Sequence, residues 1–233
     1  MRQQNFKGVT VRDRNAKSGL KAGLSALVAT LALLAFPLAA SATNAQTLAA
    51  LPSVSQPIGD IGAAKPIQGW VKFCETYPGE CAVDVSEPSV VEITPQIWKT
   101  IVSVNQRVNA TVKPITDQDH WGVVDHWGFP NDGQGDCEDF QLLKRRMLVD
   151  GGLPRRAMRM TVVIDELGEG HAVLMLRTNQ GDYVLDNKTS SILPWEKTGY
   201  VFIKRESQSA ETWVSLGGIT SPTIGTPTTT ANK

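Results

Sequence analysis

The hydrophobic positions of this chain follow a helical spacing in its middle part. A helix is predicted after Thr94-Pro95, because threonine accepts hydrogen bonds from the first turn of a helix and proline suits its first position. Apolar residues then recur at intervals of three or four across residues 97–108, which places them on one face. This segment is therefore expected to be a helix with one buried face.

A second helix is predicted to begin at Asp136 or Cys137 and to end at the glycine pair 151–152, because glycine commonly follows the last helical turn. Its buried face would consist of Phe140, Leu143 and Met147. The preceding residues 114–136 show no periodicity and are rich in Asp, His, Trp and Gly. They are predicted to form a loop with a high density of functional side chains.

The remaining hydrophobic pattern is typical of strands. Valine, isoleucine, leucine and tyrosine dominate four runs, which are residues 158–165, 171–177, 182–185 and 200–204. Glycine-containing segments at 167–170 and 179–182 are the expected hairpin loops. Helices followed by antiparallel strands predict the α+β class.

The N-terminus has the pattern of an export signal. Six basic residues precede an uncharged apolar run at 22–38, and an Ala-x-Ala cleavage pattern follows at 40–42. We interpret residues 1–42 as a cleaved signal peptide that leaves no stable membrane insertion. The alternative is a membrane anchor, since the run is near the lower length limit for a spanning helix.

Composition divides the rest of the chain into three parts. Residues 43–65 are rich in Ala, Pro and Gly and are interpreted as a linker. Residues 66–210 are expected to form one folded domain. Residues 211–233 become rich in Thr and Pro after Ser215 and are predicted to be disordered, because they offer little apolar surface to bury.

The net charge of zero conceals an acidic mature protein. Of the 23 basic and 23 acidic residues, six basic and one acidic lie in residues 1–42, so 17 and 22 remain, with a net charge of −5. An acidic domain argues against a nucleic-acid partner. Export would place it in an oxidising compartment, where disulfides persist.

The three cysteines of the chain divide into a pair and a single thiol. Cys74 and Cys81 flank a turn sequence at residues 77–79, which suits a disulfide that closes a short loop. Half of a metal site is the alternative, but the chain has no second cluster of Cys and His to complete one. Cys137 is left without a partner.

Cys137 is predicted to be a nucleophile. A thiol reacts as the thiolate, which a helix N-terminus and a nearby imidazolium both stabilise. His171 would supply the imidazolium, and Asp186 would orient its ring. The alternatives are a buried structural thiol, a core histidine and a turn aspartate, each of which is reasonable on its own.

The pairing of His171 with Asp186 sets a condition on the hairpin between them. Direct opposition of the two residues requires a hairpin centred between Thr178 and Asn179, whereas a tight two-residue turn at 180–181 would move them out of register. We therefore predict a longer loop or a bulge in this hairpin. A two-residue turn without a bulge would count against the catalytic set.

Three carboxylates surround the predicted nucleophile, at Asp136, Glu138 and Asp139. Further acidic residues lie in the preceding loop: Asp117, Asp119, Asp125 and Asp132. Calcium binds six to eight oxygen atoms and favours carboxylates. Helix capping and the helix dipole also explain acidic residues in a first turn, and the residues alone favour that explanation.

Residues 135–140, 170–174 and 181–187 resemble the corresponding motifs of the bacterial transglutaminase-like cysteine proteinases, which include the LapG-type proteases. The resemblance extends over about residues 69–205. It implies a papain-like, transglutaminase-like core with the nucleophile at a helix N-terminus packed on an antiparallel sheet. It also implies that Cys137, His171 and Asp186 act as nucleophile, general base and orienting residue in peptide-bond hydrolysis through an acyl-enzyme.

Further expectations follow from this resemblance. LapG-type members act in the periplasm, where they cut the N-terminal region of large surface adhesins and release cells from a biofilm. An inner-membrane cyclic-di-GMP receptor sequesters them. They require calcium near the nucleophile, and the matching positions here are Asp136 and Glu138, with Asp139 as a third candidate.

Two points remain open at the level of sequence. An oxyanion hole would use the backbone N–H of Cys137 and a second donor, for which Asn105 and Trp127 are candidates. The same three catalytic residues also serve transglutaminases and deamidases that act on protein glutamine, and a catalytically inactive binding module of this fold is a further alternative.

Overall fold

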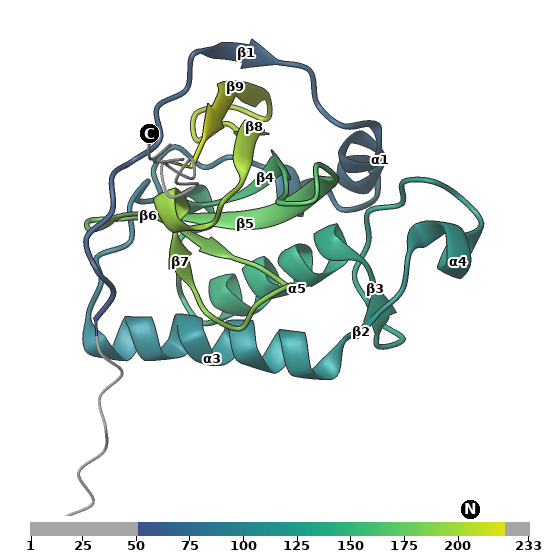
Figure 1. Cartoon of the computed structure of the whole chain (residues 1–233), viewed down its shortest axis with the longest axis horizontal. Coiled ribbons are helices and arrows are strands. Elements are labelled where there is room, and N and C mark those ends of the chain that lie inside the picture. The colour runs from purple at the N-terminus through teal and green to yellow at the C-terminus, as the bar shows by residue number, and fades with distance from the viewer. Residues whose placement is uncertain (1–50, 222–233) are drawn as a thin grey trace, which may run out of the picture. The chain divides into compact units, whose positions relative to one another are not determined.

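The computed structural model describes residues 51–221 (Figure 1). The predicted signal peptide, the first part of the predicted linker and the end of the predicted tail lie outside the described residues. Over residues 51–221, no helix is both long enough and apolar enough to cross a membrane.

A seven-stranded sheet forms the centre of the structure, and all of its neighbouring strands are antiparallel. Its order is β1 (Gly62–Ala64), β9 (Trp213–Thr220), β8 (Val201–Glu206), β4 (Met158–Ile164), β5 (Gly170–Thr178), β6 (Gly181–Leu185) and β7 (Leu193–Pro194). A separate parallel pair consists of β2 (Lys113–Pro114) and β3 (Gln134–Gly135). The predicted α+β class is confirmed.

Two long helices lie below the sheet in Figure 1, with α5 (Cys137–Asp150) between the strands and α3 (Pro95–Thr111). The start of α3 is the predicted one, since the Thr94 side chain accepts a hydrogen bond from the Ile97 N–H. The shorter helices are α1 (Gln68–Thr76), α2 (Pro78–Cys81), α4 (Asp117–Trp121) and the 3-10 turns η1 (Arg155–Ala157) and η2 (Trp195–Lys197).

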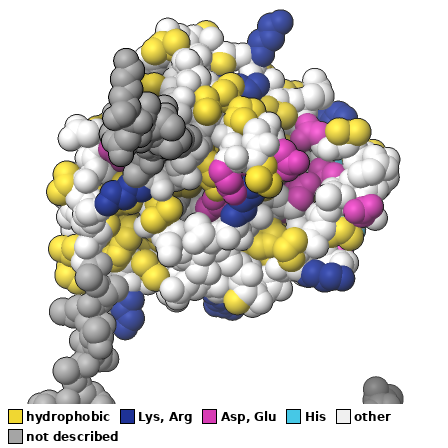
Figure 2. All heavy atoms as spheres, in the orientation of Figure 1, with side chains coloured by type: hydrophobic (Ala, Val, Ile, Leu, Met, Phe, Trp, Pro, Cys, Tyr) yellow, Lys and Arg dark blue, Asp and Glu magenta, His cyan; other side chains and the backbone are white. Residues whose placement is uncertain are grey.

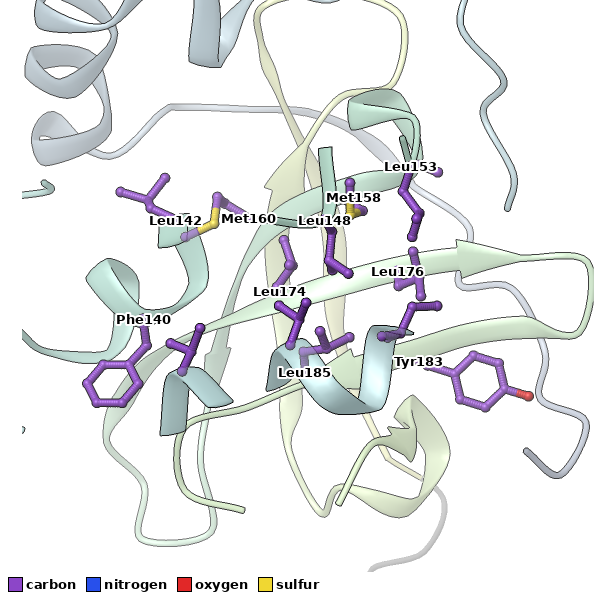
Figure 3. Close-up of a cluster of buried hydrophobic side chains, with 14 of the residues drawn as sticks. Phe140, Leu142, Leu148, Leu153, Met158, Met160, Leu174, Leu176, Tyr183 and Leu185 are labelled. Carbon is purple, nitrogen blue, oxygen red and sulfur yellow. The ribbon is translucent and has the colours of Figure 1, made fainter. Parts of the chain in front are cut away.

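The main hydrophobic core lies between these helices and the sheet. Figure 3 shows Phe140 and Leu148 of α5 in the same cluster as Leu174 and Leu176 of β5. These two strand residues are two apart, so they face the same side of the sheet. Complete burial of such a side chain contributes about 1.5–3 kcal/mol. The nucleophile candidate therefore stands at the end of a helix that is firmly packed.

The alternate residues of β5 belong to a second core on the opposite face. Val173 and Met175 pack there with Trp195, Phe202 and Ile58. Residues 51–61 cross this face as an extended strap. They bond to the sheet at several points, for example from the Ile58 N–H to Asp182 (2.9 Å) and from the Ser55 N–H to the Gln180 carbonyl (2.7 Å). The prediction of a linker over residues 43–65 is therefore wrong for the described part of that segment.

The predicted disorder of residues 211–233 is also wrong as far as Thr220. Strand β9 pairs with both β8 and β1, and Trp213 is buried against Trp70 with ring centroids 5.8 Å apart. The remainder of that predicted tail, residues 222–233, lies outside the described residues.

Candidate active site

The start of α5 positions Cys137. Asp136 occupies the extended N-cap position and Cys137 is the first helical residue. Gly135, just before them, lies so close to the Asp139 carboxylate that an added Cβ would stand 2.6 Å from its Oδ2. A side chain at position 135 would therefore displace Asp139, so the close approach of the loop to the helix requires glycine here.

The surroundings of the thiol favour its protonated form. Burial raises the pKa of Cys137 well above its usual value, and the neighbouring Glu138 raises it further. The Cys137 Sγ lies 3.1 Å from Glu138 Oε2 and accepts a weak contact from the Ala172 N–H at 3.4 Å. The sequence predicts that the helix N-terminus stabilises the thiolate. In the structure, burial and the Glu138 carboxylate have the larger effect on the thiol pKa, and both raise it.

His171 and Asp186 form a buried hydrogen-bonded pair. His171 Nε2 lies 2.9 Å from Asp186 Oδ1, and both side chains are almost fully buried. Burial alone would raise the pKa of Asp186. Hydrogen bonds from His171, from the Tyr200 hydroxyl and from the Lys188 N–H stabilise the carboxylate and hold that pKa below its ordinary value. Asp186 is thus kept ionised beside the imidazole.

The hairpin between these residues differs from the prediction. Strands β5 and β6 pair without a bulge from Leu174–Leu185 to Thr178–Gly181, which leaves a two-residue turn. The predicted longer loop or bulge is wrong. Continuing the same register places Asp186 two positions from the residue opposite His171, on the same face. Diagonal neighbours of this kind are within reach of long side chains, so the tight turn does not prevent the pair.

Cys137 and His171 line one pocket, together with Trp127, Ile67 and Val162 among others. Within residues 51–221, however, no hydrogen bond joins the thiol to the imidazole, because the thiol contacts Glu138 instead. The structure therefore brings the three predicted catalytic residues to one site. The Cys137 thiol contacts the Glu138 carboxylate there, and not the His171 imidazole that was expected to be its base.

Asp186 lines a second pocket. This pocket is also lined by Tyr200, Lys188, Thr189 and Leu193 among others, and neither Cys137 nor His171 belongs to it. Asp186 does not line the pocket that Cys137 and His171 share, so the two pockets are distinct.

The two oxyanion candidates have different surroundings. Trp127 lines the pocket of Cys137, but its indole N–H donates to Asp125 Oδ1 at 3.0 Å. Asn105 is fully buried in α3 and donates to the Ser190 carbonyl at 3.1 Å. The structure does not bring Asn105 to the thiol, and its amide anchors the segment after Asp186 instead.

Five carboxylates gather beside Cys137, and we call them the acidic cluster: Asp117, Asp125, Asp136, Glu138 and Asp139. They form two overlapping groups, each with three ligand oxygens within 4.8 Å of one another. Asp and Glu side chains accordingly gather on the right of the face in Figure 2, where α1 and the start of α5 lie in Figure 1. The sequence named Asp136, Glu138 and Asp139 as metal candidates and four further acidic residues in the preceding loop, and the structure brings two of those four, Asp117 and Asp125, into the cluster.

Burial is the largest cause of raised pKa values in the acidic cluster. It raises the pKa of Asp117 and of Asp136, that of Glu138 well above its usual value and that of Asp139 to about 8. Neighbouring carboxylates add to the effect at Asp136, Glu138 and Asp139. In the described part of the chain, no lysine or arginine forms a salt bridge with any of the five.

Several backbone and side-chain donors orient these oxygens. The N–H groups of Gly69 and Gly128 donate to Asp125 (2.8 Å) and Asp139 (2.9 Å), and the His126 N–H donates to Asp117. Asp136 Oδ1 is buried and has no hydrogen-bond partner among residues 51–221. An all-oxygen donor set with an unpaired buried carboxylate oxygen fits a hard divalent cation such as calcium.

The predicted disulfide is confirmed: Cys74 and Cys81 are bonded across α1 and α2, with Cα atoms 5.6 Å apart. Cys137 is the free cysteine. The alternative of half a metal site at the pair is therefore excluded.

Comparison with known proteins adds a family match. The model of the family described as "bacterial transglutaminase-like cysteine proteinase" matches residues 60–221. No curated protein matches the chain.

Solved structures of LapG from Legionella pneumophila are also similar, at 27% identity. The calcium-bound form has a TM-score of 0.43 and the EGTA-treated form 0.41, and each match covers 47% of this chain. The chain spans 64% and 62% of the length of these two LapG chains, which is less than two thirds.

Proposed function

The chain belongs to the bacterial transglutaminase-like cysteine proteinase family, and on this premise we propose that it is an exported, calcium-dependent endopeptidase with Cys137, His171 and Asp186 as its catalytic triad. The observation that carries the proposal is the buried His171–Asp186 pair at 2.9 Å in the same site as the free thiol. A paired, ionised aspartate beside a histidine is what a thiol protease needs to orient its general base.

The proposed reaction uses the two nitrogens of His171 for different tasks. Nε2 is held by Asp186, so Nδ1 is the nitrogen that takes the proton from the Cys137 thiol. The sulfur attacks the carbonyl carbon of the substrate, and the proton passes from Nδ1 to the leaving amine as the peptide bond breaks. Water then attacks the thioester, with His171 as base, which releases the carboxylate and restores the thiol.

The acidic cluster is the proposed calcium site. Asp117, Asp136 and Asp139 form one group of possible ligands, and Asp125 and Glu138 complete the other with Asp117. A bound cation would supply positive charge beside the start of α5. Glu138 is both a candidate ligand and the group that contacts the thiol. A cation bound to Glu138 would offset the charge of that carboxylate next to Cys137 and so lower the thiol pKa, because a neighbouring negative charge disfavours the thiolate.

We propose the N-terminal region of a large surface adhesin as the substrate, a periplasmic location, and an inner-membrane cyclic-di-GMP receptor as a regulatory partner. The support for these three statements is the family resemblance of the motifs around Cys137, His171 and Asp186. The acidic mature chain and its disulfide suit an exported protein.

The experiment incubates residues 43–233 with calcium and N-terminal adhesin fragments from the same genome, and follows cleavage by mass spectrometry. We expect scission that is lost in Cys137→Ala and in His171→Ala. Amine incorporation or ammonia release without scission would assign transglutaminase or deamidase chemistry instead. No reaction of any kind would favour a binding module.

A chelator and two matched variants test the calcium site in the same assay. Chelation and Asp136→Asn are expected to abolish cleavage. Asp132→Asn, in the same loop but outside the acidic cluster, is expected to retain it. Cleavage that is indifferent to chelation would refute the calcium site and leave the triad intact.

A further inference from the structure

Tyr200 contacts the aspartate of the proposed triad. It is 5% exposed and stands immediately before β8. Its hydroxyl donates to Asp186 Oδ2 at 2.6 Å. Its ring meets the His171 ring edge-on, with centroids 5.9 Å apart and an interplanar angle of 80°. One side chain thus touches both members of the His171–Asp186 pair.

The two oxygens of Asp186 have separate partners. Oδ1 is bonded to His171 Nε2 (2.9 Å) and accepts from the Lys188 N–H (3.0 Å). Oδ2 accepts from Tyr200, which is its hydrogen-bond partner among the described residues. Because a carboxylate is planar, fixing Oδ2 also fixes the direction in which Oδ1 faces the imidazole.

We propose that Tyr200 is a positioning residue for the reaction, which holds the Asp186 carboxylate in the plane that directs Oδ1 at His171. The proposal rests on the proposed function of the triad and adds a fourth residue to it. Burial and the hydrogen bond to Asp186 raise the pKa of Tyr200 far above its usual value. The hydroxyl therefore keeps its proton and remains a donor throughout the working pH range.

Other charged groups around Asp186 do not replace this contact. Lys144, from α5, is buried, its Nζ has no hydrogen-bond partner in the described part of the chain, and burial lowers its pKa to about 7. Lys188 directs its Nζ to Asp165 at 2.5 Å and to Glu166 at 3.6 Å. His171 is hydrogen-bonded to the other oxygen of Asp186, Oδ1. Tyr200 is thus the side chain whose removal leaves Oδ2 unpaired.

The test compares Tyr200→Phe with Tyr183→Phe. Both variants remove one hydroxyl from a buried tyrosine, but Tyr183 donates to the Ser53 carbonyl of the strap (2.5 Å), away from the triad. The measured quantity is the rate at which iodoacetamide alkylates Cys137 in calcium, which requires no substrate because Cys137 is the free thiol. Thermal unfolding of both variants checks that each remains folded.

Tyr200→Phe is expected to slow alkylation about 10-fold, the lower end of the losses seen when the partner that orients a metal-binding histidine is removed. Tyr183→Phe should keep the wild-type rate. The acid limb of the pH profile of alkylation should also move up by about one pH unit. The reason is that the ionised form of Asp186 loses the hydrogen bond that the Tyr200 hydroxyl donates to it. A role confined to stability would lower the unfolding temperature without moving that limb.

His171→Ala separates failure of this proposal from failure of the proposed function. If His171→Ala slows alkylation but Tyr200→Phe gives the wild-type rate and pH profile, Tyr200 has no positioning role and the triad stands. If His171→Ala leaves the rate unchanged, His171 does not activate the thiol, and both proposals are overturned.

Discussion

Two groups of buried charges lie on either side of the sheet, and they differ in whether the chain supplies them with counter-charges. Beneath the strap, Asp182 is fully buried and receives a two-pronged contact from Arg177 (2.9 and 2.8 Å), the Ile58 N–H (2.9 Å) and Arg205 (3.4 Å). We call Asp182, Arg177 and Arg205 the arginine cluster. The acidic cluster beside Cys137 has five carboxylates and no salt bridge to a lysine or arginine among the described residues.

The difference separates charges that build the fold from charges that await a ligand. Burying an unpaired ion is costly, so structural ions are accompanied by counterions from the same chain. The arginine cluster follows this rule and ties the strap to β6. The acidic cluster departs from it, and its carboxylates respond with raised pKa values. A site that departs from the rule is a candidate for function.

Asp182→Asn should have the largest effect on stability. The change removes the buried counter-charge of Arg205 and of the half-buried Arg177, and leaves the exposed Asp60, 3.9 Å from Arg205, as the remaining carboxylate. Breaking a buried ion pair in this way is expected to cost about 3–5 kcal/mol of unfolding free energy. Chemical denaturation with and without calcium measures the loss, which should be the same in both conditions. A loss below about 1 kcal/mol would show that the arginine cluster is not held together by this carboxylate.

Calcium should have the next largest effect, and it should act through the acidic cluster. A ligand that binds only the folded state at 100 times its Kd stabilises by about 2.7 kcal/mol. For a domain of this size that corresponds to a rise in Tm of roughly 5–10 °C. Differential scanning fluorimetry measures it, with Asp136→Asn expected to lose the rise and Asp132→Asn to keep it. An equal rise in all three proteins would place the ion elsewhere.

The smallest effect concerns pH in the absence of calcium. The pKa of Asp139 is about 8 in the folded state, far above its value in an unfolded chain. Between about pH 4 and pH 8 the folded state therefore binds more protons than the unfolded state, so stability falls as pH rises. Asp139→Asn should flatten this slope and raise stability at pH 8, because the asparagine side chain carries no charge that burial can disfavour.

Denaturation of the calcium-free proteins from pH 5 to pH 8 checks this prediction. Saturating calcium should remove most of the slope from the wild type, because the bound ion takes the place of the protons. An unfolding free energy of the wild type that rises from pH 5 to pH 8 would contradict the raised pKa of Asp139. The acidic cluster would then no longer differ from the arginine cluster in having carboxylates destabilised by burial.

Much of the site was visible in the sequence because its signals are local. Thr94-Pro95 and Gly151 mark helix ends through their own backbone preferences, and Cys137 follows from its position at such an end. The register of β5 and β6 was beyond reach, because it depends on which residues form the turn. A diagonal pair across a two-residue turn serves His171 and Asp186 as well as direct opposition would.

The contacts that two segments make with distant strands could not be predicted from the sequence, for a related reason. Residues 51–64 belong to a segment rich in Ala, Pro and Gly, and residues 213–220 lead into a segment rich in Thr and Pro, so the sequence predicts a linker and a tail there. Their stability comes from backbone hydrogen bonds to strands distant in the sequence, such as the pairing of Ala64 with Trp213. Tyr200 gave no signal either, because its role depends on a contact with Asp186 that only the folded sheet creates.

The pocket that Asp186 and Tyr200 line is a second place at which a ligand could act on the proposed triad. A small molecule placed there would touch Asp186 and Tyr200 without entering the pocket that holds Cys137. Such a molecule would need no electrophile, because it would not have to react with the thiol.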